Sequence, residues 1–165
     1  MKHAGRGLRR GAFAPLVLFA SWLAHAAPLD VHGTVHPGAC EPRPWQALQA
    51  RIKALQGGPA APSPEPLIRA LLCGNGPADQ AALLAAAPGR IPHTSEATGE
   101  PTVRRKLRAS EVLTPLAGDA WDVSLERVRG ELRLHFQANE ACVRSVVLRL
   151  QREGWRFVRA DEGCD

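Results

Sequence analysis

Two strands predicted around the Arg129-Gly130 turn bring together residue types that could do hydrolytic chemistry. Their pairing makes Ser124 and His135 direct cross-strand neighbours, with Asp122 close by. Serine, imidazole and carboxylate are the groups of a nucleophilic hydrolase. However, side chains standing parallel on a flat sheet face rarely converge as a triad, and the sequence has no G-x-S-x-G motif. We interpret the three residues as a solvated polar face, so the sequence predicts no catalytic residue.

Metal-binding residue types occur near the N-terminus. His32, His36 and Cys40 are spaced four apart, which would align three ligands on one face of a helix. Gly33 and Pro37 argue against a helix there, and Cys40 is expected in a disulfide. We therefore expect no metal site, and no motif indicates another cofactor.

The densest local charge is a basic cluster of Arg104, Arg105, Lys106 and Arg108. It could bind an anionic partner such as a phosphate, a lipid headgroup, a cell-wall polymer or an acidic protein surface. Alternatively, the charges protect an exposed edge strand from aggregation. Nucleic acid is not expected as a partner, because exposed aromatic residues are scarce and no binding motif is present.

The five aromatic residues after the first 26 residues fall at positions predicted to face inward. A place in the core is the simplest interpretation for all of them. If the sheet curls around the helices, Trp121 and Phe136 could instead line a pocket for a small ligand.

Residues 1–26 have the pattern of a secretory signal peptide. A cationic start is followed by an apolar run from Ala12 to Leu23 and by Ala24-His25-Ala26, a signal-peptidase site. The run is too short for a membrane span. The sequence therefore predicts a periplasmic or secreted protein without a stable membrane span after cleavage, with general secretory and twin-arginine export both open.

Cleavage would also change the charge of the chain. The whole sequence has 21 basic and 16 acidic residues, and four of the basic ones lie within the first 26 residues. The remaining chain has 17 basic and 16 acidic residues, so its net charge falls from +5 to +1. The basic pI therefore gives no support for nucleic-acid binding.

After a flexible lead-in at residues 27–43, residues 44–165 are predicted to form a single α+β domain. Its helical half, residues 44–89, has apolar residues at helical spacing in two or three short stretches separated by glycine and proline. Residues 90–101 have no periodicity and are predicted to be a loop. In the β half, residues 102–165, the apolar period changes to two, which predicts an antiparallel meander of about four strands.

The predicted strands at residues 120–128 and 131–138 have one apolar and one polar face in a single register. That register places Trp121 opposite Ala138 and Leu125 opposite Leu134 on the apolar face. A slip of one residue would mix the two faces.

The four cysteines all follow the predicted cleavage site, which favours two disulfides in an oxidising compartment. Cys40 precedes the first helix and Cys73 ends the second, two points that are adjacent in an antiparallel helix pair. Cys142 falls opposite Cys164 or its neighbour if the last two strands pair. The layout predicts the pairs Cys40–Cys73 and Cys142–Cys164.

Short helices followed by an antiparallel meander over residues 44–160 resemble, in element order, the cystatin-like and nuclear-transport-factor-like folds. The resemblance implies a helix packed into the concave face of a curved sheet. Members of these families include enzymes, ligand carriers, inhibitors and assembly proteins, so the fold selects no function.

Two functions are compatible with the sequence. The first is a small exported accessory protein of inhibitor, immunity or envelope-assembly type, which binds a protein or an anionic envelope component and is not an enzyme. The alternative is a pocketed domain that binds or acts on a small apolar ligand.

Overall fold

The computed structural model describes residues 37–165 of the 165-residue chain, so the predicted signal peptide, His32 and His36 lie outside the described residues. Three helices come first along the described chain, and a single helical turn interrupts the strands. None of these helices is long and apolar enough to cross a membrane. The helices are α1 Pro42–Leu55, α2 Glu65–Leu72, α3 Pro77–Ala85 and α4 Ala109–Val112.

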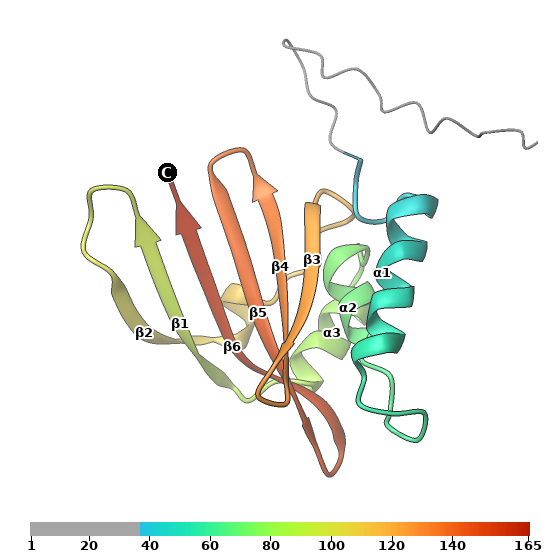
Figure 1. The fold of residues 1–165 in the computed structure, drawn as a ribbon. Helices are drawn as coiled ribbons and strands as arrows, with labels where there is room; N and C mark the ends of the chain where they lie inside the picture. The colour runs from blue at the N-terminus through green and yellow to red at the C-terminus, as the bar shows by residue number, and fades with distance from the viewer. Residues whose placement is uncertain (1–36) are drawn as a thin grey trace, which may run out of the picture. The chain divides into compact units, whose positions relative to one another are not determined.

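Six strands form one sheet in the order β2-β1-β6-β5-β4-β3 (Figure 1). Neighbouring strands are antiparallel except β1 and β6, which run parallel. The predicted α+β class and its order of helices and then strands are therefore confirmed, whereas the predicted count of about four strands is too low. The strands are β1 Arg90–Ala97, β2 Val103–Arg108, β3 Trp121–Val128, β4 Glu131–Asn139, β5 Cys142–Gln151 and β6 Gly154–Cys164.

The largest correction is β1, because most of it lies in the segment predicted to be a loop. Its backbone is paired on both sides, with β2 along its length and with β6 from His93 onward. Pro92, which has no N–H to donate, comes just before the parallel ladder with β6 begins. Pairing with a strand about 67 residues away therefore makes a strand of a segment with no local strand pattern.

The β3–β4 hairpin keeps the predicted register over most of its length. Ser124 pairs with His135 and Leu125 with Leu134, but Trp121 pairs with Gln137 instead of Ala138. A β-bulge between Trp121 and Ser124 causes this difference, and Asp122 within it has a φ of 49°. An extra residue of this kind leaves no trace in an alternating sequence pattern.

The core lies between the helices and one face of the sheet, which we call the inner face. Phe157 is fully buried, and its backbone N–H donates to the carbonyl of Ala86 at 2.8 Å, just after α3. The indole Nε1 of Trp155 donates to the carbonyl of Pro62 at 2.7 Å, in the loop before α2. Of the five aromatic residues predicted to face inward, Trp45, Phe136, Trp155 and Phe157 are buried, whereas Trp121 is only partly buried.

Val147 is buried although it lies on the opposite, outer face of the sheet. Its register partners there are Arg133 on β4 and Arg159 on β6, and it is only 1% exposed. The aliphatic parts of arginine side chains can cover apolar surface in this way. Val146, Val147 and Leu148 of β5 are therefore buried on both faces of the sheet, without a second layer of secondary structure over Val147.

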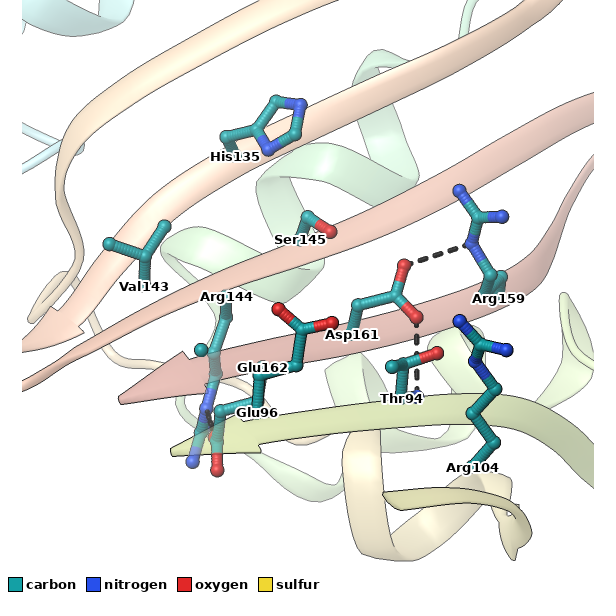
Figure 2. Close-up of a pocket in the computed structure, with 11 residues that line it drawn as sticks. Thr94, Glu96, Arg104, His135, Val143, Arg144, Ser145, Arg159, Asp161 and Glu162 are labelled. Carbon is teal, nitrogen blue, oxygen red and sulfur yellow. Dashed lines mark hydrogen bonds and ion pairs between the residues drawn. The ribbon is translucent and has the colours of Figure 1, made fainter. Parts of the chain in front are cut away.

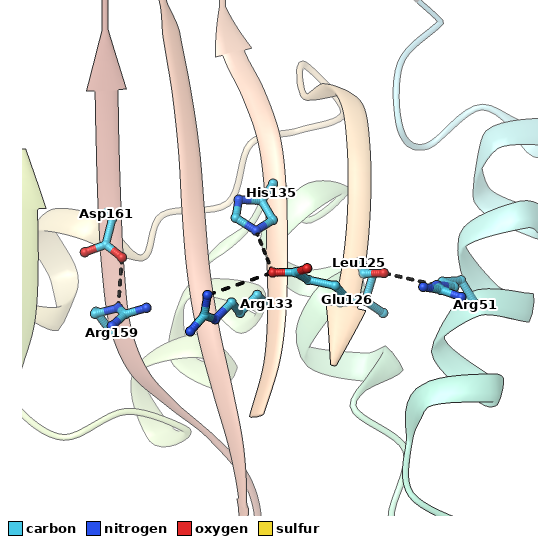
Figure 3. Close-up of polar contacts among 7 residues, drawn as sticks. All are labelled: Arg51, Leu125, Glu126, Arg133, His135, Arg159 and Asp161. Carbon is cyan, nitrogen blue, oxygen red and sulfur yellow. Dashed lines mark hydrogen bonds and ion pairs between the residues drawn. The ribbon is translucent and has the colours of Figure 1, made fainter. Parts of the chain in front are cut away.

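Helix α1 lies beside β3, which is one edge of the sheet (Figure 1). The Nε of Arg51 on α1 donates to the backbone carbonyl of Leu125 at 3.1 Å (Figure 3). In return, Nη1 of Arg127 on β3 donates to the carbonyl of Leu55 at 2.7 Å, at the end of α1. The helix thereby supplies a hydrogen-bond partner to a strand edge that has no neighbouring strand.

Both predicted disulfides are present. Cys40–Cys73 joins the chain just before α1 to the end of α2, and Cys142–Cys164 joins paired positions of β5 and β6. The match at β5 and β6 includes an irregularity between Val147 and Leu148, which shifts the register so that the two cysteines face each other.

Candidate ligand-binding site

A cavity of about 190 Å³ opens on the inner face of the sheet, between β1, β2 and the single turn α4. Figure 1 shows α1, α2 and α3 gathered toward the β3 side, away from β2. The floor comes from β4, β5 and β6, where the apolar side chains of Phe136, Val146 and Ala160 contribute. Leu107 and Val112 add an apolar wall on the β2 and α4 side. The cavity therefore combines an apolar floor with the polar groups described next.

His93 on β1 is the polar residue that distinguishes this cavity. Among residues 37–165 it is the only polar or charged residue that is buried, with 8% of its surface exposed. Its Nδ1 is buried without a hydrogen-bond partner. Buried polar atoms are nearly always hydrogen-bonded, and leaving one unpaired costs about 1–3 kcal/mol. Because His93 itself lines the cavity, its ring is a candidate to form a hydrogen bond with a ligand.

Arg105 on β2 supplies a positive charge to the same cavity. It pairs directly with His93 across the antiparallel β1–β2 ladder, so the two side chains share the inner face. Arg105 is exposed, and no carboxylate among residues 37–165 is close enough to form an ion pair with it. Its guanidinium is thus available to an anionic group of a ligand.

A second arginine in the cavity is already neutralised. Nε of Arg144 on β5 forms a short contact with the carboxylate of Glu162 on β6, its direct cross-strand partner. Both residues line the cavity, and both are partly buried. The pair therefore gives the wall a fixed polar surface with little net charge.

The carboxylate of Glu111 lines the α4 side of the cavity. It accepts hydrogen bonds from the backbone N–H and the Nε of Arg108, at 2.8 and 2.9 Å. These bonds from Arg108 hold the pKa of Glu111 below its usual value, so the group is ionised at neutral pH. Because Glu111 is occupied by Arg108, it does not neutralise Arg105.

The sequence gives no indication that His93, Arg144 and Glu162 are site residues. His93 lies in the segment predicted to be a loop, and the other two are brought together only by the β5–β6 register. Ile91, His93 and Ser95 are two apart and point to one face of β1, but only Ile91 is apolar, so the sequence shows no alternation of polarity there.

Of the predicted pocket pair, Phe136 lines this cavity, but Trp121 does not. Trp121 is paired with Gln137, the residue after Phe136, and residues that follow each other in a strand point to opposite faces. The bulge in β3 therefore separates the two aromatic residues that a regular hairpin would have placed together.

The predicted polar face is the outer face of the sheet. One row of polar residues crosses all six strands there. In sheet order from β3 to β2, its members are Ser124, His135, Ser145, Asp161, Thr94 and Arg104.

This row does not form a catalytic triad. Asp161 accepts the backbone N–H of Thr94 at 3.2 Å and pairs with the Nε of Arg159 at 2.9 Å (Figure 2). The Nε2 of His135 lies 3.6 Å from the carboxylate of Glu126 (Figure 3). Ser124 and His135 are neighbours as predicted, but Asp122 lies in the bulge. An open groove of about 420 Å³ over this row has mixed charge on its walls.

The basic cluster occupies β2, which is an edge strand. This position is required by the interpretation that the charges protect an exposed edge from aggregation. Arg104, Lys106 and Arg108 share the outer face, whereas Arg105 turns to the inner face. The cluster is therefore divided between two surfaces, and its role as a partner-binding site stays a prediction.

The cysteines give no metal site within the described residues. Cys142 and Cys164 lie close to Glu162 in a spacing that ligands could adopt. Both sulfurs are held in a disulfide, as is that of Cys40, so none can supply the thiolate that a metal would bind.

No protein-family model and no curated protein matches this sequence. A solved structure similar to it is an NTF2-like protein with a cystatin-like fold from Novosphingobium aromaticivorans, with a TM-score of 0.37 and 12% identity, covering 76% of this chain and 91% of that one. A candidate dehydratase of the NTF2-like family from Streptomyces avermitilis gives a TM-score of 0.27 and 15% identity, covering 73% and 93%. These descriptions contain the fold names expected from the element order. Because these TM-scores are low, the neighbours identify no site residue, and the candidate site is defined by this chain's own residues alone.

Proposed function

We propose that this protein binds a small molecule with a carboxylate and a short apolar body in the inner cavity of the sheet. The observation that carries the proposal is that His93, a residue that lines the cavity, has a buried Nδ1 with no hydrogen-bond partner. A ligand oxygen that bonds to this atom would remove the cost of leaving it unpaired.

The charge of the ligand follows from Arg105. Its guanidinium faces the same cavity without an ion-pair partner in the described chain, and a carboxylate fits a guanidinium with two parallel hydrogen bonds. The Arg144–Glu162 pair is nearly neutral as a unit, so Arg105 sets the local preference for an anion. The ligand is therefore amphipathic, not purely apolar as the sequence alone indicates.

The size of the cavity restricts the ligand. The cavity volume of about 190 Å³ lies below the roughly 300 to 1,000 Å³ of typical ligand pockets, so the ligand must be small. Phe136 and Val146 form a floor against which a short alkyl chain or a single ring would pack. We assign His93 to recognition of the ligand, with no turnover implied.

We further propose that the protein works in an oxidising compartment outside the cytoplasm. Two disulfides pair all four cysteines of the chain, and such bridges persist in oxidising environments. The N-terminal pattern of the sequence supports export. Mass spectrometry of the protein isolated from its source, which reads the mature N-terminus, tests this location and would contradict it if Met1 were retained.

The binding proposal is tested by titrating the mature protein, labelled with ¹⁵N in histidine, with acetate, butyrate, benzoate and the neutral benzamide. We expect the ring nitrogens of His93 to shift saturably with a carboxylate, and His135 on the outer face to stay unchanged. Benzamide should bind more weakly than benzoate because it lacks the charge. If no carboxylate shifts His93, or if His135 shifts equally, the proposal is wrong.

Arg105→Gln and Arg104→Gln form a matched pair, since the two residues are adjacent on β2 and face opposite sides. Loss of a charge-assisted hydrogen bond of about 1.5–3 kcal/mol predicts at least about tenfold weaker benzoate binding for Arg105→Gln. Arg104→Gln should bind within about twofold of the unchanged protein. Equal losses in the two variants would show that general surface charge, not the cavity, attracts the anion.

A further inference from the structure

The two edge strands of the sheet, β3 and β2, differ in whether another element covers their open side. At β3, Arg51 of α1 bonds to the edge carbonyl of Leu125. At the other edge, β2 pairs only with β1, and no helix or strand of the described chain pairs with its second side. Five of its six residues are exposed, and only Leu107 is partly buried. The backbone groups of β2 that point away from β1 are thus open to a further strand.

The outer face of this open edge is positively charged. Arg104 and Lys106 stand opposite Thr94 and Pro92 of β1, which offer no carboxylate. Neither cation has an ion-pair partner among residues 37–165, whereas Arg108 is paired with Glu111 at 2.8 Å. Glu96 of β1 lines the same outer groove as Arg104 but lies beyond ion-pair distance. Two free cations, two residues apart, therefore follow the edge at a spacing of roughly 6.6–6.8 Å.

Pairing of two copies of this chain through β2 is disfavoured by the same charges. A β2–β2 ladder would bring the basic residues of one copy beside those of the other, and like charges directly opposite each other destabilise a sheet. The occupant that fits the edge is a segment of opposite charge.

We propose that β2 accepts an extended acidic segment of a partner protein as a seventh strand. Main-chain hydrogen bonds to the open edge supply affinity, and carboxylates at every second position of the segment face Arg104 and Lys106. A strand has its side chains on one face at alternate positions, so the repeat of two in the partner matches the repeat of two in β2. This surface is separate from the inner cavity, because Arg105 points to the other face.

The probe is a fluorescently labelled eight-residue peptide that alternates glutamate with threonine or valine. Two control peptides are used: one with lysine in place of glutamate, and one with the acidic sequence but N-methylated at alternate residues, which removes strand hydrogen bonds and keeps the charge. Fluorescence anisotropy with the mature protein is expected to show binding of the acidic peptide only. Binding should weaken as salt rises from about 20 to about 300 mM, because exposed charges are screened.

Amide hydrogen exchange locates the contact. The acidic peptide is expected to slow exchange within Val103–Arg108 and to leave the covered edge at β3 unchanged. If the N-methylated peptide binds equally well, or if β2 gains no protection, strand addition is wrong and the charges only guard the edge.

The variants are Arg104→Glu with Lys106→Glu, against Arg152→Glu as a control at the exposed β5–β6 turn. Replacing two attractions by two repulsions is expected to weaken peptide binding by about tenfold or more. Arg152→Glu should leave it unchanged, and hydrogen exchange of the free variants verifies that each is folded. Equal effects of the double change and of Arg152→Glu on peptide binding would overturn the proposal.

Discussion

Glu111 shows how one side chain organises the short turn between β2 and the rest of the chain. Its carboxylate accepts from both the backbone N–H and the side chain of Arg108, so it caps α4 and ties the end of β2 to it. The bonds from Arg108 lower its pKa. Glu111 is exposed to solvent, so its effect is local order and not a large share of the stability.

This geometry predicts a pH dependence for α4. Because the pKa of Glu111 is lowered in the folded state, its contribution is present above the ordinary glutamate pKa of about 4.5 and is lost as the pH falls through the lowered value. The amide resonance of Arg108 should therefore move with an inflection below about 4.5 in an NMR titration.

Glu111→Gln should remove that inflection, since glutamine does not ionise. Glu100→Gln is the control, because Glu100 is exposed in the β1–β2 turn and its carboxylate has no hydrogen bond or ion pair with a side chain of residues 37–165. An inflection that survives in Glu111→Gln would assign the titration to another group.

At the scale of elements, α1 has two roles. Trp45, Leu48 and Ile52 are buried toward the core, as their helical spacing predicts. The exposed side of the helix carries Arg51, which the sequence alone would assign to solvent. Its bond to the carbonyl of Leu125 exists only because β3 is an edge strand beside α1.

Arg51→Ala should lower the free energy of unfolding by about 0.5–1.5 kcal/mol, the usual contribution of one hydrogen bond. Lys53→Ala, at an exposed position of the same helix, should change it by less than about 0.5 kcal/mol. Urea unfolding followed by tryptophan fluorescence measures both. Equal values would mean that Arg51 contributes no more than an ordinary surface residue.

At the scale of the whole molecule, the two disulfides act on different parts. Cys40–Cys73 closes a separation of 33 residues around α1 and α2, and Cys142–Cys164 closes one of 22 residues between β5 and β6. The chain-entropy model gives about 3–4 kcal/mol for each. Only the second joins elements that already share a long antiparallel ladder.

Replacing both cysteines of a pair by serine should therefore lower the stability by a few kcal/mol in each case. In Cys142→Ser with Cys164→Ser, hydrogen exchange should rise only near the ends of β5 and β6, while the ladder from Val146 to Trp155 stays protected. In Cys40→Ser with Cys73→Ser, exchange should rise in α1. Loss of protection along all of β5 and β6 would contradict this division.

The sequence by itself determined the features that depend on residues close together in the chain or on the order of the elements. Alternating polarity and the Arg129-Gly130 turn fixed the Ser124–His135 register, because a slip of one residue would put apolar side chains in water. The spacing of the cysteines relative to these elements fixed both disulfides.

Only the tertiary structure decided the features that depend on pairing between strands far apart in the chain. The strand β1 exists because β6 and β2 satisfy its backbone, and no local pattern reports that. Its pairing buries His93 beside Arg105, which creates the cavity, while the bulge in β3 turns Trp121 away. Local periodicity records which face of an element is apolar, but the neighbour that covers the face is set by the free energy of the whole fold.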